Sequence, residues 1–471
     1  MNQLLLHDAF FAAAARYPNR VAVTRGKDSR TFGELAEAVP RYAQALAHAG
    51  VRRGDRIGCW CDTDLDLVPL YFASAAIGAT FTPANPKFSD SEARAVFDLA
   101  DPRLVVVDES HEGDIRLADL NRSTAASGID VEPVQETDGH IMFFTSGTTG
   151  KPKAIELSHR TDTLRALSSM SNLPNGPTVS MFPLFHMSGW TSATSPWLRG
   201  EEVVLADGAD AAGLMEAIER RRAERFYAIP AVWRRILELD LSGFDLGSLR
   251  QADTGTSATT LQLLDAIHDA LPQTTTTVTY GSTEAGGVCQ LPFNDLHRKP
   301  GSVGPPGPYV FVRLEDGELW TKSPFLFTGY FGNPDATAAA LVDGWYRTGE
   351  LAEIDGEGYV TIVGRSSEII RTGGESVAPA EVDAILLEHT AIADGAVAGV
   401  PHDDWGEVIA AFVVLHPGAS LTLDDLQQHC HGHIAPFKVP RRLVVVDAIP
   451  RTGATRQVQR RLLVERALKP A

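Results

Sequence analysis

The sequence predicts an α/β protein with a large N-terminal domain, residues 1–366, and a small α+β C-terminal domain, residues 367–471. Short apolar runs alternate with helical patterns as far as about residue 280, which is typical of strands joined by helical crossovers in a largely parallel sheet. Between residues 301 and 319 the pattern changes to Gly/Pro turns and short alternating strands, which indicates a small β-barrel. We therefore expect an N-terminal domain of parallel-rich α/β subdomains plus a small β-barrel.

Periodicity and capping signals place the elements of the first half in order. Apolar residues at helical spacing predict helices, and short continuous apolar runs predict buried strands. Thr31 followed by Glu34 is a capping box, so a helix is expected to begin there. We expect helices at residues 1–20, 31–49, 65–78 and 89–99, and strands at 20–24, 56–60, 79–83, 104–108 and 141–144.

The second half repeats this alternation and then enters the C-terminal domain. Residues 365–367 are polar and lack strand character, so we place the domain boundary there. We expect helices at 160–172, 210–222, 259–271, 379–388 and 423–433, and strands at 178–182, 202–205, 225–229, 274–280, 359–364, 392–399, 408–415 and 442–446.

Composition limits the kind of protein this can be. The 471 residues carry a formal net charge of −18 and no long basic run, which argues against nucleic acid or an anionic membrane surface as partner. Any anionic substrate must therefore be attracted by local positive groups. Four cysteines in so long a chain suggest reduced thiols. We find neither a signal-peptide pattern nor an apolar run of membrane-spanning length, and we expect a cytoplasmic protein.

One stretch concentrates hydrogen-bond donors. Residues 143–153 read Phe-Phe-Thr-Ser-Gly-Thr-Thr-Gly-Lys-Pro-Lys, with four hydroxyls, two glycines and two lysines after an apolar lead-in. Glycines let the backbone approach a ligand, and turned-in amides, hydroxyls and ammonium groups suit phosphate oxygens. The common phosphate loop needs four residues between its first Gly and a Gly-Lys-Ser/Thr ending, whereas only two separate the glycines here. We therefore expect a different kind of phosphate-binding loop; a flexible surface loop with a basic end is the alternative.

Five further blocks follow in order along the chain. They are residues 183–190 (Pro-Leu-Phe-His-Met-Ser-Gly-Trp), 253–258 (Asp-Thr-Gly-Thr-Ser-Ala), 280–284 (Tyr-Gly-Ser-Thr-Glu), 344–350 (Gly-Trp-Tyr-Arg-Thr-Gly-Glu) with Gly364-Arg365, and 373–375 (Gly-Gly-Glu) with 379–381 (Pro-Ala-Glu). Together with residues 143–153 they resemble the signatures of the adenylate-forming superfamily, in particular its acyl-CoA synthetase branch of AMP-dependent ligases. The resemblance covers nearly the whole chain.

This resemblance implies a site for ATP and Mg²⁺. Glu284 follows a predicted strand, at the carboxyl end where open α/β sheets bind ligands, and is a hard oxygen ligand for Mg²⁺; a solvated turn carboxylate is the alternative. Tyr280 can stack on a purine, and Glu350 stands where the family usually has an Asp that accepts the ribose hydroxyls. The residues expected to bind nucleotide are Thr145, Ser146, Gly147, Thr148, Thr149, Gly150, Lys151, Thr256, Ser257, Ala258, Tyr280, Gly281, Ser282, Thr283, Glu350 and Arg365. The residues expected to hold the metal are Glu284 and Thr145.

The same resemblance implies an acid pocket and a thiol channel. His186 and Trp190 resemble the wall between the two, although a lone His is often a satisfied core residue. Trp190 and Tyr227 favour a flat or modest apolar acid. The residues expected around the acid are His186, Trp190, Tyr227, Thr254, Gly281, Gly286 and Gly287, where the last two leave room. Those expected along the thiol acceptor channel are Gly373, Gly374 and Glu375.

The implied reaction has two steps. A fatty or aryl carboxylate attacks the α-phosphorus of ATP·Mg²⁺ to give an acyl adenylate and pyrophosphate, and a thiol, most simply that of CoA, then displaces AMP. The enzyme positions two anions and neutralises their repulsion. In the family the small C-terminal domain is mobile and rotates between the steps. The residues expected to act in catalysis are Lys153, His186, Glu284, Arg365 and Arg456; for Arg365 a structural salt bridge is the alternative.

Two departures from the family pattern leave alternatives open. Ser367 stands where the hinge residue is usually Asp or Lys, and Arg456 stands where a terminal Lys usually bridges the acid and the α-phosphate. Arg is cationic but planar and wider. The alternatives are an acyl-AMP ligase that loads a carrier-protein pantetheine, and a repurposed relative that activates another oxyanion, for example nitrite for diazotisation of an amine. The sequence leaves the acid and the oligomeric state open.

Overall fold

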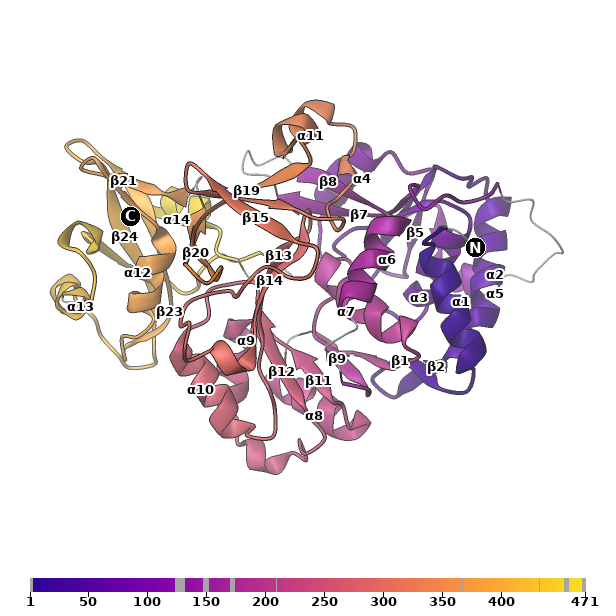
Figure 1. The fold of residues 1–471 in the computed structure, drawn as a ribbon, viewed down its shortest axis with the longest axis horizontal. Coiled ribbons are helices and arrows are strands. Elements are labelled where there is room, and N and C mark those ends of the chain that lie inside the picture. Colours follow the sequence, from indigo (N-terminus) through magenta and orange to yellow (C-terminus); the bar gives the residue numbers. More distant parts are fainter. Residues whose placement is uncertain are drawn as a thin grey trace.

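The computed structural model describes residues 3–122, 132–146, 152–169, 174–208, 210–365, 368–431, 433–452 and 457–467. A large N-terminal body holds three sheets, and a separate C-terminal domain lies beside it, orange to yellow at the left of Figure 1. This mixed α/β architecture confirms the predicted fold class. In the described residues no helix is both long and apolar enough to cross a membrane.

A seven-stranded sheet carries the predicted phosphate loop. Its order is β17-β8-β7-β4-β3-β5-β6, and its inner strands are parallel, as predicted. β7 and β8 form an antiparallel pair in which Ser146 lies opposite Pro152, and residues 147–151 between them lie outside the described residues. The strands are β3 Arg56–Trp60, β4 Thr80–Pro83, β5 Leu104–Val107, β6 Ile115–Arg116, β7 Gly139–Ser146, β8 Pro152–Ser158 and β17 Gly329–Tyr330. The helices joined to these strands are α3 Leu67–Ala76, α4 Asp90–Ala100 and α5 Leu117–Arg122.

An eight-stranded sheet, in the order β14-β13-β12-β11-β9-β10-β1-β2, supplies much of the remaining site. All pairs from β1 to β13 are parallel, while β2 and β14 add antiparallel edges. The strands are β1 Val21–Arg25, β2 Asp28–Thr31, β9 Thr178–Ser180, β10 Val203–Leu205, β11 Arg225–Tyr227, β12 Gln251–Gly255, β13 Val278–Ser282 and β14 Gly286–Leu291. Its helices are α8 Ala211–Arg221, α9 Pro230–Leu237 and α10 Leu261–Ala270, with 3₁₀ turns at Leu241–Gly243 and Phe293–Asp295.

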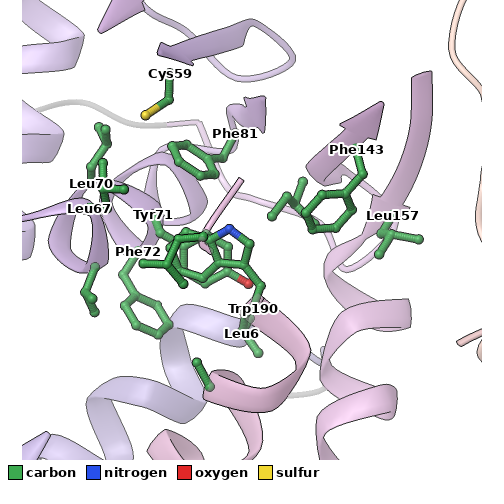
Figure 2. Close-up of a cluster of buried hydrophobic side chains, with 14 of the residues drawn as sticks. Leu6, Cys59, Leu67, Leu70, Tyr71, Phe72, Phe81, Phe143, Leu157 and Trp190 are labelled. Carbon is green, nitrogen blue, oxygen red and sulfur yellow. The ribbon is translucent and has the colours of Figure 1, made fainter. Parts of the chain in front are cut away.

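Helices α1, α2, α6 and α7 pack with α3 around the main aromatic core. Figure 2 shows Trp190 of α7 lying against Tyr71 of α3, with ring centroids 4.0 Å apart and the planes 18° from parallel. The predicted capping box of Thr31 and Glu34 is present at the start of α2. These helices span α1 Leu6–Arg16, α2 Phe32–His48, α6 His159–Ser168 and α7 Met187–Leu198.

The region predicted as a small β-barrel is a five-stranded antiparallel sheet. Its described strands follow the open order β15-β16-β19-β18, with β20 also paired to β19. The elements are β15 Phe311–Glu315, β16 Glu318–Lys322, β18 Leu341–Val342, β19 Trp345–Ile354, β20 Val360–Arg365 and helix α11 Pro334–Ala340.

The C-terminal domain has its own sheet and its own apolar core. The predicted domain boundary falls between β20 and β21, where residues 366 and 367 lie outside the described residues. Strands β23 and β24 form the long central hairpin, and β25 pairs with β24 in parallel. The elements are β21 Ile370–Thr372, β22 Glu375–Val377, α12 Pro379–Leu386, β23 Ile392–His402, β24 Gly406–Leu415, α13 Leu423–Cys430, a 3₁₀ turn Pro436–Lys438, β25 Arg442–Val445 and α14 Arg460–Ala467.

Candidate active site

A cleft of about 2970 Å³ lies between the N-terminal body and the C-terminal domain and is lined by residues of both. The parallel strands β11, β12 and β13 run toward it, and residues at or just beyond their carboxyl ends, Tyr227, Thr256 and Ser282, line its wall. This is where open parallel sheets bind ligands, because the helix crossovers leave a crevice at that edge.

On the side of the cleft that is predicted to bind the triphosphate, one tyrosine contacts both a cation and a carboxylate. Thr145 of β7 lies opposite Lys153 of β8, and both line the cleft. The Lys153 ammonium lies 4.5 Å from the ring centroid of Tyr330, whose hydroxyl donates to Glu284 Oε1 at 3.1 Å. Tyr330 therefore holds the two predicted catalytic groups in one arrangement, and sequence reasoning missed it.

Other predicted phosphate-binding residues cannot be placed. Gly147, Thr148, Thr149, Gly150 and Lys151 lie outside the described residues, as do Ser367 and Arg456. Ser146 ends β7, next to this gap.

The predicted nucleotide side brings Tyr280, Glu350 and Arg365 to one part of the cleft wall. Arg365 Nε donates to Glu350 Oε1 at 3.3 Å across the β19–β20 pair. Burial raises the pKa of Glu350 against the opposing effect of Arg365, and it also raises the pKa of Tyr280, with Glu350 adding to that increase. The salt-bridge alternative for Arg365 is thus present, and 42% of its side-chain surface is still exposed.

Adjacent predicted residues complete this wall. Thr256 has a positive φ of 72°, a strained conformation for a β-branched residue, and it lies directly after β12. The residues that also line the cleft here are Ser257, Ala258, Ser282 and Thr283.

His186 occupies the predicted boundary of the acid pocket as the N-cap of α7. Its Nδ1 accepts the Ser188 N–H at 3.1 Å, and burial lowers the pKa of His186 to about 4. At neutral pH the ring is uncharged, and an accepting Nδ1 requires the proton on Nε2. His186 can therefore donate a hydrogen bond into the cleft without adding a charge.

Two residues predicted for the acid pocket do not line the cleft in this structure, and their contact with the acid stays a prediction. Trp190 is 1% exposed and packs among Tyr71, Phe81 and Trp197, so it belongs to the aromatic core and does not line the cleft. Thr254 is fully buried within β12 and likewise does not line it.

The glycines near β14 have different structural reasons. Gly281, Gly286 and Gly287 all line the cleft. A Cβ at Gly281 would lie 2.1 Å from the Gly286 carbonyl oxygen, and one at Gly286 would lie 2.8 Å from Arg165 Nε. A Cβ at Gly287 would meet no atom within 4 Å. Open space was predicted at both Gly286 and Gly287, and of these two only Gly287 has it.

The predicted thiol-channel residues lie on the β21–β22 hairpin of the C-terminal domain. None of Gly373, Gly374 and Glu375 lines the cleft in this structure, and Gly373 packs under the indole of Trp405. Their contact with a thiol stays a prediction.

The donor set suits ATP·Mg²⁺. Lys153 and Arg365 provide cations, Thr145 and Thr283 provide hydroxyls, and Glu284 provides a carboxylate oxygen. Among the described residues no group of three or more His, Cys, Asp or Glu side chains could hold a metal ion. Mg²⁺ that is bound mainly by phosphates and water needs only one or two protein oxygens, and Glu284 with Thr145 fits that arrangement.

Comparison with known proteins identifies the family. Residues 10–331 match the model of AMP-binding enzymes, and residues 381–456 match that of the AMP-binding enzyme C-terminal domain. The 2-succinylbenzoate–CoA ligase of Geobacillus sp. (strain WCH70) is 30% identical over 476 residues, which cover 94% of each chain. The indoleacetate–CoA ligase of Aromatoleum aromaticum is 31% identical over 493 residues, covering 95% of this chain and 96% of that protein.

Solved structures agree with this. The o-succinylbenzoate CoA synthetase from Bacillus subtilis in complex with its acyl-adenylate intermediate has a TM-score of 0.88 and 27% identity, and the match covers 97% of each chain. The enzyme from B. subtilis in complex with ATP and a magnesium ion matches equally well, with a TM-score of 0.88. The chain therefore belongs to the AMP-binding enzyme family, and it is an AMP-forming acid–thiol ligase of the acyl-CoA synthetase branch, which uses ATP and Mg²⁺ to activate a carboxylic acid and passes the acyl group to CoA.

Proposed function

We propose that this ligase activates an aromatic carboxylic acid, bound between Tyr227 and the open face of Gly287, and joins it to CoA. The single observation that carries this proposal is the empty space beside Gly287 on the cleft wall. The two relatives described above are named for aromatic acids, 2-succinylbenzoate and indoleacetate, which supports the same substrate class.

Tyr227 offers a fixed aromatic surface to such an acid. Its ring lies 5.6 Å from that of Phe182, and both line the cleft. Its hydroxyl is 3.0 Å from Thr256 Oγ1 and accepts a hydrogen bond from Thr279 Oγ1 at 3.4 Å. A ring held by hydrogen bonds at its hydroxyl and by contact with Phe182 favours a flat ligand that stacks against it, because little side-chain entropy is lost on binding.

The proposed roles follow from the placement of the charged groups. Lys153 and Arg365 would neutralise the repulsion between the acid carboxylate and the α-phosphate, and the His186 Nε2–H would orient the acid. Mg²⁺ held by Glu284 and Thr145 would balance the charge on the departing pyrophosphate. Arg456 would approach the α-phosphate, where the family usually has a lysine.

CoA is the acceptor in this proposal. The matched relatives are named as CoA ligases, so neither carrier-protein loading nor activation of nitrite is needed to explain the chain. We also place the enzyme in the cytoplasm, because all four cysteines are free thiols.

A panel of acids tests the proposal directly. Benzoate, 2-succinylbenzoate, indoleacetate, octanoate and palmitate are compared by pyrophosphate release, with and without CoA, and by thioester formation. We expect aromatic acids to give both products with the higher kcat/KM. Preference for the linear fatty acids would contradict the aromatic pocket, and acid-dependent pyrophosphate release without thioester would contradict CoA as acceptor.

A pair of glycine variants locates the pocket. Gly287→Leu adds a side chain to open space at a backbone position without positive φ, so the fold should tolerate it. We expect kcat/KM for the larger aromatic acids to fall by about 10- to 200-fold, the range for a steric mismatch in a pocket, with the KM for ATP unchanged. Gly243→Leu is the matched control, because Gly243 is also surrounded by open space but lies outside the cleft lining. If kcat/KM in Gly287→Leu falls equally for benzoate and for the largest acid, the proposal that the acid binds beside Gly287 is refuted.

A further inference from the structure

Arg165 of α6 is a buried guanidinium directly behind the predicted magnesium ligand. It is 3% exposed, and it also contributes to the cleft lining. Its Nε and Nη2 donate to the Phe325 carbonyl at 2.9 and 2.7 Å, and Nη2 also donates to the carbonyls of Thr283 and Glu284 at 3.1 Å each. One side chain therefore ties the Thr283–Glu284 backbone to a separate segment, 325–327.

The surrounding backbone is shaped around this guanidinium. Gly286 has a φ of +71°, and a Cβ there would lie 2.8 Å from Arg165 Nε. The Glu284 carbonyl also accepts the Phe327 N–H at 2.7 Å. The main chain of Glu284 is thus held by Arg165 and Phe327 together, and only glycine fits where the chain turns past the guanidinium.

The side chain of Glu284 is held separately, by the Tyr330 hydroxyl at 3.1 Å. Backbone and carboxylate therefore have independent anchors, and Arg165 provides the anchor that comes from the helix. A metal–phosphate site tolerates little displacement, since catalytic groups must be held within about 0.5 Å of their productive positions. Fixing the main chain of Glu284 would help to hold its carboxylate within this tolerance.

A buried cation is a costly way to bind these carbonyls, because a neutral donor could bind them without the desolvation of a charge. Burial lowers the pKa of Arg165 to about 10, against the opposing effects of Asp162 and Glu284, so it stays protonated at neutral pH. Asp162, three residues earlier on α6, is also buried and accepts the Tyr71 hydroxyl at 2.7 Å. Among the described residues, Arg165 Nη1 has no hydrogen-bond partner. A charge kept with an unsatisfied donor suggests a role beyond packing.

We propose that Arg165 is a positioning residue for the adenylation step: it fixes the backbone of Glu284 so that the carboxylate meets Mg²⁺·ATP in one geometry. The proposal rests on the proposed role of Glu284 as a metal ligand.

The test measures the Mg²⁺ concentration for half-maximal pyrophosphate release at saturating ATP and acid. In Arg165→Met we expect kcat to fall by about 10- to 100-fold, the loss associated with a catalytic group displaced by up to 1 Å. We also expect the Mg²⁺ requirement to rise, while the KM for the acid stays within a factor of about two, because none of these Arg165 hydrogen bonds goes to Tyr227 or Gly287. Arg165→Lys should recover part of kcat, since it restores the charge and one donor.

Two further variants keep the test decisive. Gly286→Ala disturbs the same contact from the other side and should raise the Mg²⁺ requirement in the same direction. Arg221→Met is the matched control. Arg221 donates to both carboxylate oxygens of Glu202 at 2.8 Å and does not line the cleft, so this variant should lower thermal stability but leave the Mg²⁺ requirement unchanged.

The outcomes separate this proposal from the one on which it rests. Full activity in Glu284→Gln would overturn the metal-ligand role itself. If Glu284→Gln is inactive while the folded Arg165 variants and Gly286→Ala keep the wild-type Mg²⁺ requirement, then Arg165 is only structural and the positioning role is wrong.

Discussion

The loss of folding stability at acidic pH can be calculated for one buried histidine. His7, in the first turn of α1, is 9% exposed and lies 5.6 Å from the ring of His159. Burial lowers the pKa of His7 to about 4, against the effect of Asp8 and together with that of His140, from 6.5 in the unfolded chain. Because the folded pKa is the lower one, the unfolded chain binds more protons as pH falls, and stability is lost between pH 6.5 and 4.

The size of the loss follows from these two pKa values. The histidine costs about 0.2 kcal/mol of folding free energy at pH 7 and about 1.4 kcal/mol at pH 5.5, so this change of pH removes about 1.2 kcal/mol through His7 alone. His7→Leu cannot bind the proton. We therefore expect the variant to lose about 1.2 kcal/mol less than the wild-type protein over the same pH range, whatever its stability at pH 7.

Urea unfolding at the two pH values measures this difference, with tryptophan fluorescence as the probe. Trp190 is suitable because it stacks on Tyr71, which itself contacts the ring of His140 near His7. His297→Leu is the control, because it removes a histidine whose side chain is 72% exposed, and its unfolding is measured at the same two pH values. If His7→Leu and the wild-type protein lose equal stability between pH 7 and 5.5, the reasoning from burial is refuted.

Three further predictions concern the site. Lys153→Met and Glu284→Gln should each lower the rate of pyrophosphate release by about 100-fold or more, and wild-type rates in either variant would remove that residue from the site. Arg456→Lys should retain or raise the adenylation rate, because lysine supplies the same charge as a point donor; complete loss would show that the guanidinium has a role of its own. Glu350→Ala should raise the KM for ATP by about tenfold, as expected when a hydrogen bond from a charged group is lost, and an unchanged KM would argue against a ribose contact.

Local signals in the sequence predicted most of the fold. The capping box at Thr31, the helical spacing and the short apolar runs all depend on neighbouring residues, and most of the corresponding elements are present. Helix α9 was missed although Pro230 occupies its first turn, a common position for proline. Helix α7 was missed because Gly189 and Pro196 interrupt its pattern. For α7, packing against the core stabilises a helix that propensity alone disfavours.

The candidate site was predicted only where a motif places its residues consecutively. Tyr330 and Arg165 reach Glu284 from 46 and 119 residues away in the sequence, so no local pattern could indicate them. Trp190, which does not line the cleft, illustrates the opposite limit of a motif. It belongs to a motif, but its place on α7 turns the ring toward Tyr71, and a motif specifies neighbours without specifying direction.

The way these cations are held explains how a chain with a net charge of −18 can bind two anions. On the surface, basic groups are paired with acids: Arg298 contacts Asp295 and Glu357, and Lys299 contacts Asp355. In the cleft, Lys153 lies over an aromatic ring, and the hydrogen-bond partners described for Arg165 are carbonyl oxygens. Rings and carbonyls fix a cation without cancelling its charge, and a partly enclosed cleft weakens the screening by solvent. The charges of Lys153 and Arg165 therefore remain available to the phosphates and the acid, although the field of the whole protein repels both.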